Sequence, residues 1–144
     1  MGLKLTPFKD TPHSAIESFN ERMKAANSHL RLSDTPPFNP LPSSATSRLV
    51  EEAFVAVDSK GTARGGLILK HQDFLIKGER LNIAAYRRPL SEGAVDPKYA
   101  MVGFQILRQA LKIQPRIFDL GMGSLDKPHP RVLIAAKWFF AARC

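Results

Sequence analysis

The sequence predicts an α+β domain built on one mixed, mostly antiparallel sheet flanked by helices. The first observation is a run of three strand-like segments joined by short glycine-containing turns, which is typical of an antiparallel meander, at residues 52–58, 64–72 and 81–90. The second is a pair of segments with apolar residues at helical spacing, one before and one after the meander. With 144 residues, 44% of them hydrophobic, residues 1–144 are expected to form a single domain with a real core.

The chain before the meander is expected to give a short strand, a helix and a loop. Residues 3–8 are typical of an edge or terminal strand, because Pro7 lacks the N–H that a central strand needs. Thr11-Pro12 is expected to cap a helix that follows, with Ser14 and Glu17 at capping-box spacing. The four prolines of residues 32–44 exclude helix or central strand there and predict an extended surface loop.

The chain after the meander is expected to give a helix, a strand and a second helix. Asp96-Pro97 supplies a capping residue and a proline suited to a helix start, and the apolar spacing predicts a helix over 99–113. Pro115 ends this helix, and residues 116–120 are expected to form a strand that the glycines of 121–123 break. Residues 131–143 are apolar on most faces and predict a final helix with more than one packing partner.

The junction at 91–111 is the most informative stretch, because it joins a strand to a helix through a turn. A helix start carries unpaired backbone N–H groups and the positive end of the helix dipole, which together suit an anion such as phosphate. Gly103 lets a ligand approach the backbone closely. The sequence therefore predicts an anion site at this helix start.

The net charge of +8 indicates a basic surface that attracts polyanions. The 21 lysines and arginines are spread along the chain, the longest run is Arg87-Arg88, and no nucleic-acid-binding motif is present. Because neighbouring strand residues face opposite sides, one of these two arginines could face a phosphate or an acidic acceptor, and the alternative is an exposed charge. We therefore expect a small polyanion such as coenzyme A and no dedicated nucleic-acid partner.

Val95-Asp96-Pro97-Lys98-Tyr99 followed by Gly103 resembles the Val-x-Pro-x-Tyr loop of the acyl-CoA N-acyltransferase superfamily, which has the GNAT-type fold. The predicted order of strands and helices also resembles that fold over nearly the whole chain. Ala100 and Gln105 depart from the pattern, which has arginine or glutamine at the first position and glycine or alanine at the last.

The resemblance implies transfer of an acyl group from acetyl-CoA or a longer acyl-CoA, the co-substrate, to a small-molecule or peptide amine. The backbone of residues 90–95 would meet the thioester and pantetheine, and that of 99–105 would meet the pyrophosphate. The coenzyme A-binding residues implied in this way are Ala94, Val95, Tyr99, Met101, Val102, Gly103, Phe104 and Gln105.

Three residues are candidates for the base that takes the amine proton. Glu92 is the first choice, because partial burial near a strand end could move its pKa toward neutrality, and the alternative is a solvated turn carboxylate. His71 and Asp73 are second candidates, two apart and so on one strand face, and the alternative is surface decoration. No tyrosine occurs in 131–143, where the family often has a general acid. A catalytically inactive ligand-binding or interaction module of the same fold therefore stays open.

The remaining features bear on location and assembly. No signal-peptide core follows Met1, the apolar run 132–142 is too short to span a bilayer, and the lone Cys144 allows neither a disulfide framework nor a thiol cluster for metal. We expect a cytoplasmic protein without a metal site or a membrane partner. The resembled family normally adds two strands after its last helix, and this chain ends at Cys144, so an uncovered sheet edge predicts a homo-oligomer.

Overall fold

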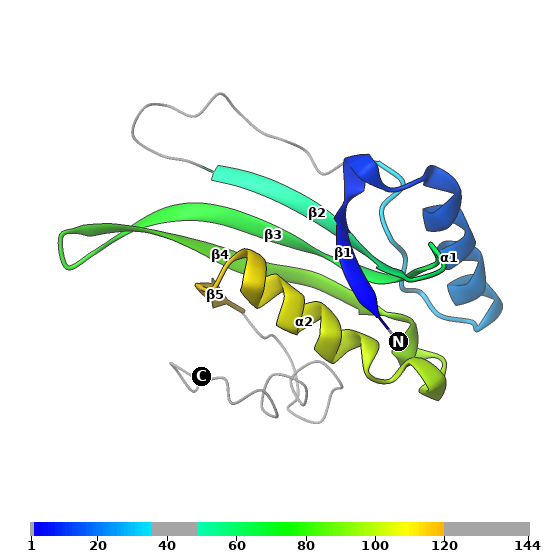
Figure 1. The fold of residues 1–144 in the computed structure, drawn as a ribbon. Coiled ribbons are helices and arrows are strands. Elements are labelled where there is room, and N and C mark those ends of the chain that lie inside the picture. Colours follow the sequence, from blue (N-terminus) through cyan, green and yellow to red (C-terminus); the bar gives the residue numbers. More distant parts are fainter. Residues whose placement is uncertain (1, 36–48, 120–144) are drawn as a thin grey trace.

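The computed structural model describes residues 2–35 and 49–119, which form one five-stranded sheet with two helices packed on it (Figure 1). The sheet has the order β1-β2-β3-β4-β5. Strands β1 to β4 pair antiparallel, and β5 pairs parallel with β4. The elements are β1 (Leu3–Pro7), α1 (His13–Ala25), β2 (Leu49–Asp58), β3 (Ala63–Ile76), β4 (Glu79–Ser91), α2 (Val102–Ile113) and β5 (Ile117–Phe118). The predicted α+β class, mixed sheet and meander are confirmed.

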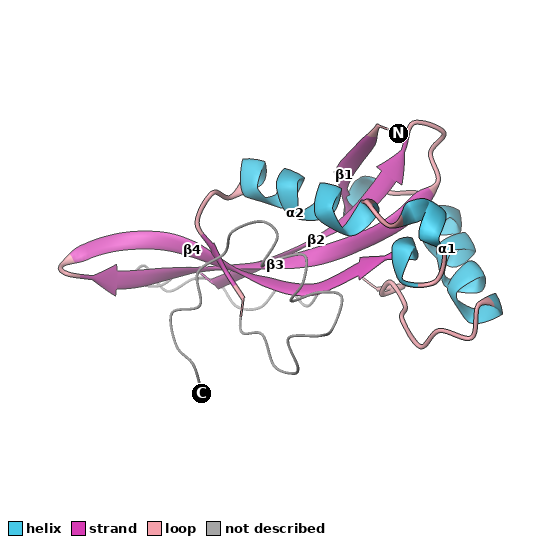
Figure 2. Cartoon of the chain, turned by 90° about the horizontal axis from the view of Figure 1, so that it is seen from below, coloured by secondary structure: helices cyan, strands magenta, loops and turns pink. Residues whose placement is uncertain are grey.

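The two helices pack against opposite faces of the sheet, as the alternation of side chains along β2 shows. Phe54 and Ala56 belong to the core beneath α2, whereas Val55 between them belongs to the core beneath α1. Figure 2 shows α2 lying across the sheet and α1 near the turn that joins β2 to β3. The helical spacing of apolar residues is confirmed as a buried face on each helix. The buried residues are Ile16, Phe19 and Met23 in α1 and Val102, Ile106, Leu107 and Ala110 in α2.

The hairpin of β3 and β4 is longer than the sequence predicts. Its turn contains only Lys77 and Gly78, which both have positive φ, at 50° and 80°. Two consecutive residues of this kind form a tight two-residue turn, so strand pairing continues to Ile76 and Glu79. The predicted four-residue turn at 77–80 was wrong by two residues for this reason.

Strand β4 contains a β-bulge near its carboxyl end. Gly66 pairs with Leu90 and Ile68 with Arg87, so one residue of β3 lies opposite two of β4, Arg88 and Pro89. The strands approach so closely beside the bulge that a Cβ on Gly65 would collide with the carbonyl oxygen of Leu90. On its other edge β4 pairs with β5 only at Ala84 and Ala85. The segment from Arg87 to Leu90 therefore has no strand on that edge in the described part of the chain.

The helix starts differ from the predicted ones. The residue before α1 is Pro12, without a side-chain cap; Thr11 donates to the Pro7 carbonyl instead, at 3.0 Å, and Ser14 lies inside the helix. The Asp96 carboxylate accepts from the Lys98 N–H at 2.9 Å and so caps a single 3-10 turn, Pro97–Tyr99, ahead of α2. Asp96 is therefore a capping residue, as predicted, but it caps this short turn, and α2 begins at Val102, later than the predicted start at residue 99.

Several predictions fall on residues that the structure does not describe. They are most of the proline-rich loop, the glycines of 121–123, the helix over 131–143 and Cys144. Within residues 2–35 and 49–119, no helix is both long and apolar enough to cross a membrane. The cytoplasmic location and the homo-oligomer stay predictions.

Candidate functional site

Glu92, the first candidate base, lies in a buried ion-pair cluster. It follows the last residue of β4 and is 5% exposed. Its Oε1 accepts a hydrogen bond from Arg22 Nε of α1 at 2.7 Å, and its Oε2 accepts one from Arg64 Nη1 of β3 at 2.9 Å. The carboxylate thus links α1 and β3 to the end of β4.

Arg64 extends this cluster to a second carboxylate, that of Asp58. Arg64 Nε donates to Asp58 Oδ2 at 2.9 Å, and the other oxygen, Oδ1, accepts from the backbone N–H groups of Lys60 and Thr62 at 2.9 and 3.0 Å. The Arg64 guanidinium also lies 4.2 Å from the centre of the Tyr99 ring, within reach of a cation–π contact. We call Arg22, Asp58, Arg64 and Glu92 the Arg64 cluster. Every carboxylate oxygen in it has a partner.

The pKa of Glu92 is shifted in the direction opposite to the one that a general base needs. Burial raises the pKa of this carboxyl, but the hydrogen bonds and charges of Arg22 and Arg64 outweigh burial and lower it below its ordinary value of 4.5. Glu92 therefore stays ionised, with its oxygens occupied. The predicted tuning toward neutral pH was wrong, and so was the alternative of a solvated turn carboxylate.

His71 and Asp73, the second candidates, are also engaged and lie away from Glu92. His71 Nε2 is 2.8 Å from Glu52 Oε2, and Asp73 Oδ1 accepts from Asn82 Nδ2 at 3.0 Å. Ser91, next to Glu92, pairs with Gly65, so His71 is six residues further along β3. At roughly 3.3 Å per strand residue this is a separation of about 20 Å. The structure does not bring the three candidates together.

The residues predicted to bind coenzyme A divide into core and accessible groups. Val102 is fully buried and Val95 packs against the core of α1, so their side chains are not free to meet a ligand. Met101 is exposed and supplies no side-chain cap to α2. The accessible side chains include Ala94 and Phe104, with Tyr99 and Gln105 partly exposed. The backbone at the helix start is what these residues offer to an anion.

Gly103 lies beside the end of β4. A Cβ placed on it would be 3.8 Å from the Cβ of Ser91, an ordinary contact distance, and no other described residue outside the helix comes nearer. The start of α2 and the end of β4 are therefore neighbours, as the expected strand-to-helix junction requires. The space around Gly103 also means that the fold itself does not demand glycine at this position.

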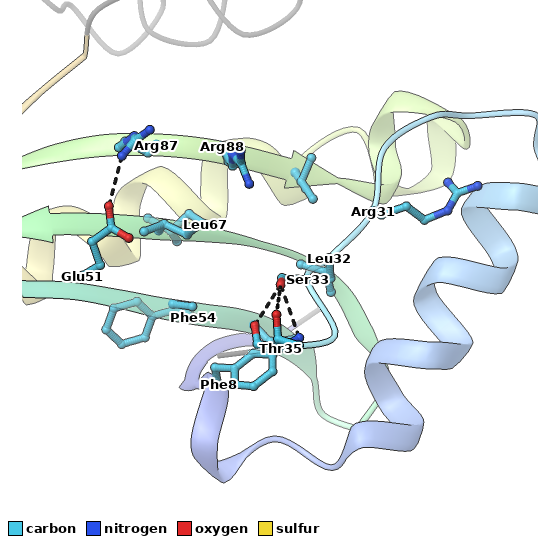
Figure 3. Close-up of a pocket in the computed structure, with 14 residues that line it drawn as sticks. Phe8, Arg31, Leu32, Ser33, Thr35, Glu51, Phe54, Leu67, Arg87 and Arg88 are labelled. Carbon is cyan, nitrogen blue, oxygen red and sulfur yellow. Dashed lines mark hydrogen bonds and ion pairs between the residues drawn. The ribbon is translucent and has the colours of Figure 1, made fainter. Parts of the chain in front are cut away.

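Sequence reasoning missed a cavity of about 320 Å³ on the α1 side of the sheet, between β2, β3, β4 and the segment 31–35 (Figure 3). Its volume lies at the lower end of the range for small-molecule sites. Phe8, Leu32, Ile68 and Leu90 contribute apolar lining. The one signal in the sequence was Pro89, because a proline within a strand marks an edge or a bulge.

Among the described residues, four that line this cavity are charged. Arg87 Nη1 donates to Glu51 Oε1 at 3.0 Å, and Arg31 Nη1 donates to the carbonyls of Ser28 and Leu30 at 2.7 and 2.6 Å. Arg88 is exposed and has no hydrogen-bond or ion-pair partner among the described residues. The expected alternation between Arg87 and Arg88 does not hold, because the bulge interrupts it and both residues line the cavity. Both are also exposed, as the alternative of an exposed charge has it.

The described ranges contain no group of three or more His, Cys, Asp or Glu side chains placed to hold a metal ion. Comparison with protein-family models, with curated proteins and with solved structures finds no match for this chain. Function is therefore inferred from the geometry of the chain itself.

Proposed function

We propose that this protein is an acyl-CoA-dependent N-acyltransferase, which transfers an acetyl or longer acyl group to an amine. The observation that carries the proposal is the junction of a bulged strand edge with a helix start. The edge of β4 from Arg87 to Leu90 lies beyond its pairing with β5, and the start of α2 lies beside Ser91 at the end of the same strand. We also propose that the chain has a GNAT-like topology.

The two parts of the junction suit the two parts of an acyl-CoA. An exposed strand edge offers backbone N–H and C=O groups to an extended chain with amides, such as pantetheine. The uncapped start of α2 offers backbone N–H groups and a positive dipole to the pyrophosphate, and Lys98 adds a positive charge in the preceding turn. The donor would thus lie along β4 with its phosphates at α2.

With the donor placed along β4, the acyl group transfers to the amine in one substitution at the thioester. The amine nitrogen attacks the thioester carbonyl carbon, so a C–N bond forms and the C–S bond breaks. The electron pair of that bond leaves on the coenzyme A sulfur as a thiolate, and the amine proton passes to a carboxylate or to water. On the cavity side that carboxylate is Glu51, whose Oε2 has no partner among the described residues.

Gly103→Asp tests the proposal. Aspartate near a helix start is favourable to folding and fits the open space, but its charge repels a pyrophosphate. We expect at least tenfold weaker binding of acetyl-CoA by isothermal titration, with an unchanged or higher melting temperature. Arg108→Gln is the matched control, because it lowers the net charge by one at an exposed position of the same helix and should leave binding nearly unchanged.

A specific outcome would contradict this reading of the junction. If ATP binds as tightly as acetyl-CoA and Gly103→Asp weakens neither ligand, the binding comes from the basic surface alone. Retained acetyl-CoA binding in a folded Gly103→Asp protein would remove the start of α2 from the site.

The second candidate function is a ligand-binding module without turnover. It is favoured by the observation that all three predicted bases have structural partners, with Glu92 ion-paired, His71 beside Glu52 and Asp73 bound to Asn82. Release of free thiol from acetyl-CoA in the presence of an amine separates the two functions. Selective acetyl-CoA binding without amine-dependent thiol release would support the module.

A further inference from the structure

Arg88 combines an unfavourable backbone conformation with an unpartnered charge at the cavity. Its φ is 47°, in the left-handed region that side chains other than glycine rarely adopt. Its guanidinium has no hydrogen-bond or ion-pair partner among the described residues. A residue kept in such a conformation at a site points to a function there.

The other left-handed residues have local explanations. Asn27 follows α1, where this conformation ends helices, and Lys77 forms the two-residue turn between β3 and β4. Arg88 lies within a strand, opposite Leu67, where a glycine would adopt the same φ more easily. The arginine side chain is therefore what distinguishes this position.

The partners of the other charged groups at the cavity determine which of them could contact a ligand together with Arg88. Glu51 has one oxygen on Arg87 and the other unpartnered in the described chain. Arg31 is occupied by two backbone carbonyls, and Figure 3 shows its side chain running along α1, away from Arg87 and Arg88. In the described part of the chain, one cation and one carboxylate oxygen thus remain available beside an apolar lining.

We propose that the cavity binds a small molecule with an anionic group, an amine and an apolar body, such as an apolar amino acid or its phosphonate analogue. Arg88 receives the anionic group, Glu51 receives the ammonium group, and Leu32, Ile68 and Leu90 contact the apolar body. The role of this small molecule as the acyl acceptor rests on the proposed function, whereas its binding rests on the cavity alone.

The ligand test uses isothermal titration of the full chain in the absence of coenzyme A. The probes are L-phenylalanine, its aminophosphonate analogue, 2-phenylethylamine without the anion and 3-phenylpropanoate without the amine. We expect L-phenylalanine or the phosphonate to bind, the stronger of the two identifying the anion, and at least tenfold weaker binding when either polar group is absent. Equal binding of L-phenylalanine and 2-phenylethylamine, or no binding of either amino acid-like probe, would overturn the proposal.

The variant test separates the charge of Arg88 from its backbone. Arg88→Gln should weaken binding of the stronger probe at least tenfold with little change in melting temperature, and Arg88→Lys should retain part of the affinity. Arg88→Gly should weaken binding as much while raising the melting temperature by about 2–4 °C, because glycine tolerates this φ. Lys77→Gly, the same backbone change in the hairpin turn, should leave binding unchanged. Wild-type affinity in both Arg88→Gln and Arg88→Gly would overturn the proposal.

The failure of this inference can be distinguished from the failure of the proposed function. If L-phenylalanine binds in an Arg88-dependent way but releases no thiol from acetyl-CoA, the cavity site stands and the acyltransferase does not. If amines without an anionic group support thiol release and L-phenylalanine does not bind, the acyltransferase stands and the cavity proposal is overturned.

Discussion

Arginines and carboxylates meet in two regions of this molecule, the Arg64 cluster and the cavity, and they are satisfied to different degrees. In the Arg64 cluster both oxygens of Asp58 and both of Glu92 accept hydrogen bonds. At the cavity Glu51 uses one oxygen on Arg87, and Arg88 has no partner in the described residues. The carboxylates of the first region are fully hydrogen-bonded within the protein, whereas the second region leaves charged groups available to a ligand.

Solvent access explains this difference. A buried charge without a partner is strongly unfavourable, so a group such as Glu92 is accommodated in the core only with complete hydrogen bonding. The exposed side chain of Arg88 keeps its hydration and needs no internal partner. Chemistry at neutral pH is therefore more easily placed at the cavity than at the cluster, although the cluster contains the carboxylate that the sequence favoured.

The largest expected effect comes from breaking the cluster at its centre. Arg64→Met removes the cation shared by Asp58 and Glu92, and each keeps only its remaining donors. Breaking a buried ion pair in this way is expected to lower the free energy of unfolding by about 3 kcal/mol. Urea unfolding followed by circular dichroism measures this, with Arg108→Met on the exposed side of α2 as the control. Equal small losses in both variants would contradict a structural role for the cluster.

Lowering the pH should also weaken the Arg64 cluster, with a smaller loss of stability than in Arg64→Met. The pKa values of Glu92 and Asp58 are lowered from ordinary values of 4.5 and 3.8, because hydrogen bonds from arginines and from backbone N–H groups outweigh the opposing effect of burial. Below about pH 4.5 the unfolded chain binds more protons than the folded one, so stability present above that pH is lost as the pH falls through the native pKa values.

Urea midpoints between pH 7 and pH 3 measure this loss. Glu92→Gln should start from a lower stability and show a shallower decline with acid, because one of the two titrating carboxyls is gone. A decline as steep as that of the wild type would assign the pH dependence to other groups.

The smallest effect is expected from the ion pair at the cavity. Arg87 and Glu51 have side-chain exposures of 47% and 19%, so solvent screens much of their attraction. Arg87→Gln is expected to change the free energy of unfolding by less than about 1 kcal/mol. A loss as large as that of Arg64→Met would show that the cavity charges also stabilise the fold, and the contrast between the two regions would fail.

The secondary structure was largely predictable because its signals are local. Ile16, Phe19 and Met23 recur at helical spacing and are buried together in α1, and the glycines at 61 and 78 occupy turns with positive φ. Element ends were less predictable. Lys77 adopts a left-handed conformation that nothing in its own side chain favours, and pairing of β3 with β4 decides where that turn falls.

The candidate site was only partly predictable. The α+β class, the meander and the adjacency of the end of β4 to the start of α2 could all be predicted from the sequence, since periodicity and turn residues act over short distances. The environment of the charged residues depends instead on how distant segments pack together. Arg22, Arg64 and Glu92 come from three separate segments, and their packing turned the expected base into a buried ion pair. The bulge in β4 brought Arg88 to the cavity, because backbone strain and strand pairing depend on the assembled sheet.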